Sequence, residues 1–76
     1  MKNISIKAWE YSFYEEQGKY FLSVMCGSVG IFELLLQLGD EEVQKYKSNG
    51  LSYIEMLVKD IQSLPSNYLY RNIISP

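Results

Sequence analysis

The hydrophobic pattern of the chain changes its period near Gly39, and this change constrains the fold more than any other feature. Between residues 4 and 38, β-branched and aromatic residues alternate with polar ones over short runs. A period of two is typical of strands with one buried face, because successive side chains point to opposite sides of a sheet. After Gly39 the apolar residues recur at helical spacing. The sequence therefore predicts an α+β fold.

Turn residues divide the first part into three predicted strands. These strands cover residues 4–14, 19–26 and 31–38. Gly18 ends the loop after the first strand and can take the positive φ that a hairpin often needs. Gly27 and Gly30 mark the second turn. Short loops between neighbouring strands predict a three-stranded antiparallel meander.

Two helices are expected after the strands. Asp40 is the predicted N-cap of the first, which extends to about Ser48, and Gly50 is expected to end it in a left-handed conformation. Residues 52–55 match the S-x-x-E capping box of a second helix. Its apolar stripe consists of Ile54, Leu57, Val58 and Ile61.

The second helix should end near Ser63, because Pro65 cannot continue it. Residues 66–76 then form a tail with a further helical turn or a short strand. The predicted order is βββαα, with one face of the sheet packed on the helices. No repeat or linker is visible, so residues 1–76 are predicted to form a single domain.

Alternation assigns the strand residues to two faces. The apolar face, expected to pack against the second helix, contains Trp9, Tyr11, Phe13, Tyr20, Leu22, Val24, Cys26, Phe32, Leu34, Leu36 and Leu38. The opposite face contains Glu10, Ser12, Tyr14, Phe21, Ser23, Met25, Ile31, Glu33, Leu35 and Gln37. Ile4 and Ile6 alternate in a different phase from the residues after them, which predicts a bulge near Ala8 and Trp9.

The second face is too apolar to be a plain solvated surface. Aromatic and Met side chains among carboxylates are typical of protein interfaces, where anchors lie inside a polar rim. Three explanations are open. The face binds a partner, it packs against a second copy of the chain, or the tail or short helix covers it.

Composition limits the functions that the chain can have. A length of 76 residues leaves little room for a large catalytic cleft. The net charge is −2, and no Lys/Arg cluster is present, which argues against nucleic acid as a ligand. Lys47, Lys59 and Arg71 are scattered and are expected to be solvated.

Catalytic chemistry is not expected. The chain has no histidine, and histidine is the commonest general base and metal ligand. Cys26 lies in a predicted strand and is expected to be a buried, inert thiol. The acidic groups at residues 15–16 and 40–42 are interpreted as a hairpin loop and a helix cap. We therefore predict no enzyme activity, no cofactor and no metal site.

A cytoplasmic location is expected, without membrane association. No segment approaches the roughly 18 consecutive apolar residues that a membrane span needs. A single cysteine fits a reducing cytosol, although it also fits an extracellular protein without disulfides.

Two segments carry a resemblance to a known group of proteins. The runs FYEEQGKYFLSV at residues 13–24 and GLSYI at residues 50–54 look like small immunity proteins of bacterial contact-dependent growth-inhibition and polymorphic-toxin systems. The resemblance covers most of the chain. It implies a cytosolic protein that neutralises a cognate toxin domain, often a nuclease, by tight binding without chemistry. Folds and binding residues vary among such families, so the resemblance transfers no residue roles.

These observations lead to one functional hypothesis and one alternative. The chain is expected to be a protein-binding module, and most concretely an immunity protein. The predicted contact residues are Glu10, Tyr14, Glu15, Glu16, Phe21 and Glu33. The alternative is a homodimeric adaptor or structural subunit that buries the second sheet face against its own copy.

Overall fold

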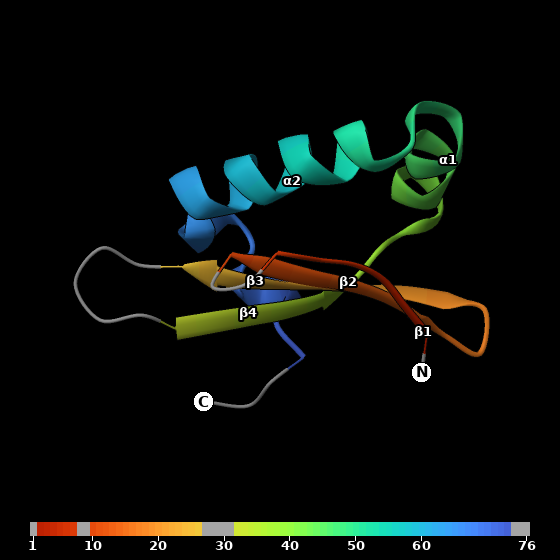
Figure 1. Cartoon of the computed structure of the whole chain (residues 1–76). Coiled ribbons are helices and arrows are strands. Elements are labelled where there is room, and N and C mark those ends of the chain that lie inside the picture. Colours follow the sequence, from red (N-terminus) through yellow and green to blue (C-terminus); the bar gives the residue numbers. More distant parts are fainter. Residues whose placement is uncertain (1, 8–9, 27–31, 74–76) are drawn as a thin grey trace.

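The computed structural model describes residues 2–7, 10–26 and 32–73, which form a sheet covered on one side by helices (Figure 1). The elements are β1 (Lys2–Lys7), β2 (Tyr11–Glu16), β3 (Lys19–Cys26), β4 (Phe32–Gln37), α1 (Asp40–Asn49), α2 (Leu51–Ser63) and the 3₁₀ turns η1 (Pro65–Asn67) and η2 (Leu69–Arg71). Neighbouring strands pair antiparallel in the order β1-β2-β3-β4. The α+β class and the meander are therefore confirmed.

The sheet has one strand more than expected, because the predicted strand at residues 4–14 folds into a hairpin. The backbone N–H of Glu10 donates to the carbonyl of Lys7 at 3.0 Å, and Lys7 then pairs with Tyr11. This reversal accounts for the change of hydrophobic phase between Ile6 and Tyr11. The predicted bulge at residues 8 and 9 lies outside the described residues, whereas β1 has a register shift between Asn3 and Ser5.

A two-residue loop joins β2 to β3. Glu16 pairs with Lys19, and the residues between them both have positive φ, 53° at Gln17 and 79° at Gly18. Positive φ at both central positions defines a type I′ turn, whose twist matches that of the flanking strands. The positive φ predicted at Gly18 is confirmed.

The core lies between the sheet and α2. It contains Tyr11, Phe13, Leu22, Val24, Cys26, Leu34, Leu36, Leu38, Tyr53, Ile54, Leu57, Val58 and Ile61. These residues include the entire predicted stripe of the second helix. Phe32 departs from the prediction with 41% exposure, because it opens β4 opposite Cys26 at the end of the sheet. Trp9 lies outside the described residues.

The helix α1 contributes a smaller part of the packing. Val43 and Tyr46 pack against the core, and the Tyr46 ring meets Phe13 edge to face at 4.9 Å between centroids. Asp40 is the first helical residue rather than the N-cap, a position taken by Gly39. The Gly39 N–H donates to the Glu42 carboxylate at 2.8 Å, so an acidic side chain of the first turn satisfies a free backbone donor.

A single residue, Gly50, separates α1 from α2, so the junction is shorter than the sequence indicated. Gly50 has a positive φ of 73°, as expected, but its ψ of −156° lies outside the left-handed helical region. Its N–H donates to the Tyr46 carbonyl at 2.6 Å. The predicted capping box at Ser52 is wrong. The helix α2 already begins at Leu51, and the Ser52 hydroxyl donates back to the Asn49 carbonyl at 2.9 Å.

The tail folds into the expected further helical turns. The helix α2 ends at Ser63, as predicted, and η1 and η2 follow within residues 65–71. Within the described part of the chain, neither helix is long and apolar enough to cross a membrane.

The β2–β3 loop yields a stability prediction. Gln17 adopts a conformation that asparagine and glycine tolerate better, so Gln17→Asn should raise the free energy of unfolding by about 0.5 kcal/mol. Gly18→Ala should lower it by about 1 kcal/mol, because alanine resists positive φ. Urea denaturation measures both changes. Gln44→Asn, a substitution of the same chemistry on exposed helix α1, should not stabilise the protein, since asparagine is a weaker helix former.

Candidate functional site

The face of the sheet opposite α2 carries most of the predicted contact residues, and we call it the open face. Residues directly opposite one another in an antiparallel pair share a face, which gives its members as Asn3, Ile6, Ser12, Tyr14, Glu16, Lys19, Phe21, Ser23, Met25, Glu33, Leu35 and Gln37. Both helices lie on the other side of the sheet (Figure 1). The short helix, one of the two segments considered as cover for this face, therefore does not lie on it, since Val43 and Tyr46 of α1 pack against the core.

A pair of stacked aromatic rings forms the apolar part of this face. Tyr14 on β2 lies directly opposite Phe21 on β3, with ring centroids 5.5 Å apart and planes inclined by 19°. Both residues are half-buried. Stacking across a strand pair restricts both side chains before any partner arrives, which lowers the entropic cost of binding.

Two carboxylates lie close to this aromatic pair. Burial raises the pKa of Tyr14 above its ordinary value, and the negative charges of Glu16 and Glu33 raise it further. Glu33 also accepts a hydrogen bond from the hydroxyl of Ser23, which is buried. The structure thus brings Tyr14, Phe21, Glu16 and Glu33 together, although Glu16 was expected in the hairpin loop and is instead the last residue of β2.

The remaining two predicted residues lie elsewhere. Glu10 is at the border of the open face, where it forms an ion pair with Lys7 at 2.9 Å and lines a shallow depression of about 210 Å³ with Ser12, Met25 and Glu33. Glu15 pairs with Tyr20 and shares the face of Phe13, so it belongs to the helix side of the sheet. The structure does not bring Glu15 together with the other residues.

Cys26 is a buried thiol, as expected. It is 2% exposed, and burial raises its pKa above the ordinary value. A thiol that is protonated at neutral pH and shielded from solvent is a poor nucleophile. Among the described residues, no three His, Cys, Asp or Glu side chains come together as metal ligands would.

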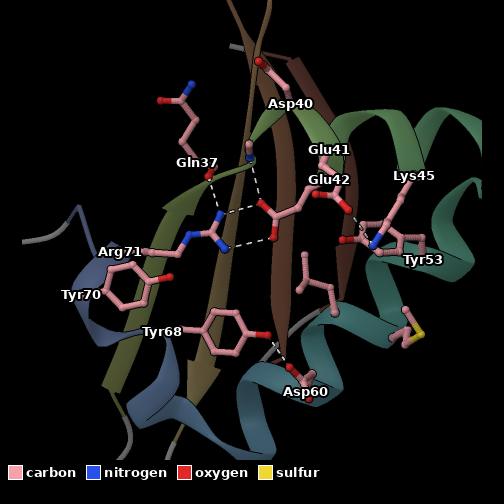
Figure 2. A pocket seen from close by; sticks show the side chains of 13 residues that line it. Gln37, Asp40, Glu41, Glu42, Lys45, Tyr53, Asp60, Tyr68, Tyr70 and Arg71 are labelled. Carbon is pink, nitrogen blue, oxygen red and sulfur yellow. Dashed lines mark hydrogen bonds and ion pairs between the residues drawn. The ribbon is translucent and has the colours of Figure 1, made fainter.

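A second concave region lies between the helices and the tail, and we call it the tail groove (Figure 2). It has a volume of about 840 Å³. Its lining comes from the start of α1, one side of α2 and the segment around η2. Sequence reasoning did not find this groove, because it depends on where the tail returns to the fold.

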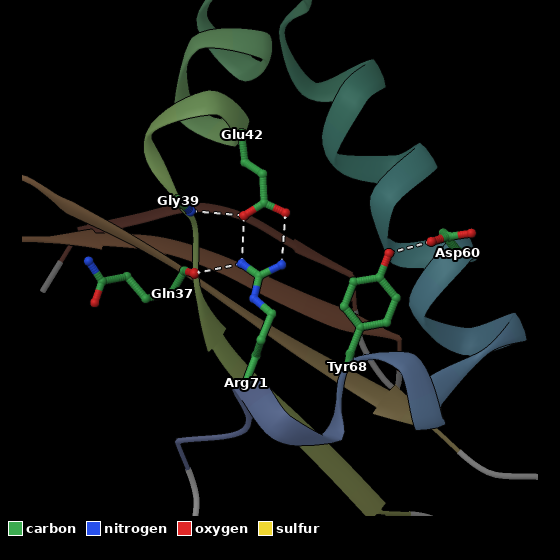
Figure 3. A network of polar contacts seen from close by, with 6 residues as sticks. All are labelled: Gln37, Gly39, Glu42, Asp60, Tyr68 and Arg71. Carbon is green, nitrogen blue, oxygen red and sulfur yellow. Dashed lines mark hydrogen bonds and ion pairs between the residues drawn. The ribbon is translucent and has the colours of Figure 1, made fainter.

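An ion pair between Glu42 and Arg71 joins the tail to α1 (Figure 3). The guanidinium donates through Nη1 to Oε2 at 3.0 Å and through Nη2 to Oε1 at 2.6 Å, which is a bidentate arrangement. Nη2 also donates to the Gln37 carbonyl at 2.9 Å. The side chains are only 22% and 19% exposed for Arg71 and Glu42. The expectation that Arg71 is solvated is therefore wrong.

The surroundings of Glu42 favour its ionised form. Burial alone would raise its pKa, but hydrogen bonds from Arg71 and from the Gly39 N–H, together with the positive charges of Arg71 and Lys45, lower it below the ordinary value. Glu42 therefore serves both as a cap for α1 and as the anchor of the tail.

A second polar contact fastens the tail to α2. The hydroxyl of Tyr68 donates to the Asp60 carboxylate. This hydrogen bond, with burial and the nearby negative charge, raises the pKa of Tyr68 to about 12. The tail is thus held at one point on each helix.

The tail also covers part of the outer edge of β4. The N–H of Leu35 donates to Oδ1 of Asn72 at 3.2 Å, and the N–H of Ile73 donates to the Leu35 carbonyl at 2.8 Å. Backbone groups that an edge strand would leave open are satisfied by the same chain.

Comparisons with known proteins give no relative. No model of a protein family, no curated protein and no solved structure matches the chain.

The Glu42–Arg71 pair predicts a loss of stability in acid. Because the pKa of Glu42 is lowered by folding, its contribution is present above the pKa of an unfolded glutamate and is lost as the pH falls below about 4. Glu42→Gln should be less stable than the native chain at neutral pH, and the difference should shrink by about pH 3. Thermal unfolding at a series of pH values measures it. Glu41→Gln, on the exposed side of the same turn, is the matched control.

The Tyr68–Asp60 contact predicts an effect at alkaline pH. A raised pKa gives stability that is complete below the ordinary tyrosine value of 10.0 and is lost as the pH rises toward about 12. Asp60→Asn should shift the titration of Tyr68 to lower pH, since the carboxylate charge is removed. NMR of ring-labelled tyrosine resolves this residue from the other six. An unchanged Tyr68 titration in Asp60→Asn would contradict the assignment.

Proposed function

We propose that the chain is a non-enzymatic protein-binding module, and most concretely a cytosolic immunity protein that neutralises a bacterial toxin domain by direct contact. The observation that supports this proposal is the stacked pair Tyr14–Phe21 on a face that neither helix covers, beside Glu16 and Glu33. The resemblance of residues 13–24 and 50–54 to immunity proteins points in the same direction.

The open face has the two components that such a contact needs. The aromatic rings supply apolar area that a partner desolvates, while the carboxylates at the edge favour a basic surface and set its orientation. Many nuclease toxins must present cationic groups to bind phosphate backbones. An inhibitor that covers those groups blocks substrate without performing any chemistry.

The edges of the sheet favour binding through the face rather than by addition of a strand. At one edge, β1 carries a register shift and has Lys2 and Lys7 at its ends. At the other edge, Leu35 of β4 is paired with the tail. A register shift, lysines on the edge strand and a segment that covers the edge all disfavour the pairing of a further strand.

A homodimeric subunit is the second candidate. Phe21, Met25 and Leu35 are half-buried apolar residues of the open face, on adjacent strands β3 and β4. A second copy related by a two-fold axis would bury the same residues on both subunits. In that case the protein has an adaptor or structural role, and the open face is not available to a toxin.

Neutralisation of a toxin tests the leading proposal. The first step is to look for a toxin-like reading frame beside the gene. Its product is then co-expressed with the native chain or with Glu16→Lys/Glu33→Lys, and cell survival and binding affinity are measured. The charge reversal should weaken binding at least tenfold, because two attractive contacts become repulsive. Glu55→Lys, at an exposed position of α2, should leave binding within about twofold. Failure of the native chain to bind that product would reject the immunity function.

Light scattering distinguishes the two candidates. A tight dimer that Phe21→Glu and Leu35→Glu convert to a monomer would favour the subunit. A monomer whose toxin binding is lost in Phe21→Glu would favour the immunity protein. Circular dichroism establishes that each variant is folded.

A further inference from the structure

We propose that the tail groove is a second binding site, and that it takes an extended basic segment of a protein partner, with Lys or Arg side chains reaching its carboxylates. This inference does not rest on the open face, which lies on the other side of the sheet. It follows from the shape, the lining and the charges of the groove.

The lining of the groove combines buried and exposed apolar side chains. Tyr53 and Leu57 are at most 9% exposed and belong to the core, whereas Met56 and Tyr70 are 60% and 85% exposed. Exposed Met and Tyr are suited to packing on the aliphatic stems of long side chains. The groove is therefore apolar enough to hold a peptide chain and has polar groups at its borders.

The charges of the groove favour a cation. Asp40, Glu41, Glu42 and Asp60 face two cationic residues, Lys45 and Arg71. Glu42 and Arg71 neutralise each other in the bidentate pair, and Lys45 lies 3.5 Å from Glu41. Asp40 and Asp60 are left without an ion-pair partner among the described residues. In the described part of the chain, the side-chain partner of Asp60 is the neutral hydroxyl of Tyr68, so no cation compensates this carboxylate.

The positions of these two carboxylates favour an extended ligand. Asp40 lies at one end of the groove and Asp60 at the other, with the Glu42–Arg71 pair between them (Figure 2). A single small cation meets one of them, whereas a chain with basic side chains at intervals meets both. An anion is disfavoured, because the guanidinium of Arg71 is already held by Glu42 and by the Gln37 carbonyl.

A peptide titration tests this proposal. The probe is a fluorescein-labelled peptide of sequence Arg-Leu-Arg-Leu-Arg-Leu, with Glu-Leu-Glu-Leu-Glu-Leu as its acidic counterpart, and anisotropy reports binding at low ionic strength. The basic peptide should bind saturably and the acidic one at least tenfold more weakly. Asp60→Asn and Tyr70→Ala should each lower the affinity for the basic peptide about five- to tenfold. Absence of saturable binding up to millimolar protein would overturn the proposal.

Matched variants locate the site. Glu55→Gln removes a carboxylate from α2, and Leu69→Ala removes an apolar side chain from η2, yet neither residue lines the groove, so affinity should change less than twofold. Equal losses of affinity in the groove variants and the control variants would show that the peptide is attracted by net charge alone. That result would overturn the assignment of the site to the tail groove. In ¹⁵N spectra, shifts should concentrate at residues 39–45, 56–60 and 68–71. Chemical-shift changes centred on Tyr14 and Phe21 would show that the peptide binds the open face and would overturn the proposal. Neither result depends on whether a toxin is neutralised.

Discussion

Burial of the α2 stripe against one face of the sheet is the interaction on which the rest of the structure depends. The four aliphatic residues of this stripe are all buried, and each contributes roughly 1.5–3 kcal/mol relative to exposure. The chain has 76 residues, and its single cysteine is free, so no internal disulfide adds to this burial. Both helices lie on this side of the sheet (Figure 1), so the other face, which carries the Tyr14–Phe21 pair, is on the outside of the two-layer fold.

The Glu42–Arg71 pair is a smaller contact with wide structural effects. Its carboxylate accepts a hydrogen bond from the Gly39 N–H at the start of α1, and its guanidinium fixes η2 beside β4 (Figure 3). Both side chains line the tail groove. Removing one partner of such a largely buried pair leaves a charge without compensation, which is more destabilising than the net contribution of the pair itself. The groove thus exists only while the tail is in place.

Local sequence signals were sufficient for much of this structure. Alternation gave the buried face from Tyr11 to Leu38, the i, i+3, i+4 spacing gave α2, and Gly18 and Gly50 gave the positive φ angles. Contacts between distant residues were not predictable in this way. Arg71 follows Glu42 by 29 residues, and no local sequence pattern around either residue indicates that the two side chains form an ion pair. The split into β1 and β2 was missed for a different reason, since the phase change near residue 8 has two explanations, a bulge or a reversal.

The pairing of Leu35 with Asn72 and Ile73 has a consequence for biosynthesis. Asn72 leaves the ribosome 37 residues after Leu35, which corresponds to roughly 2–7 s at translation rates of about 5–20 residues per second. During that interval β4 has an outer edge with open backbone groups. A nascent chain at this stage offers a template for strand pairing with other chains, and the later arrival of Asn72 and Ile73 at β4 removes that template.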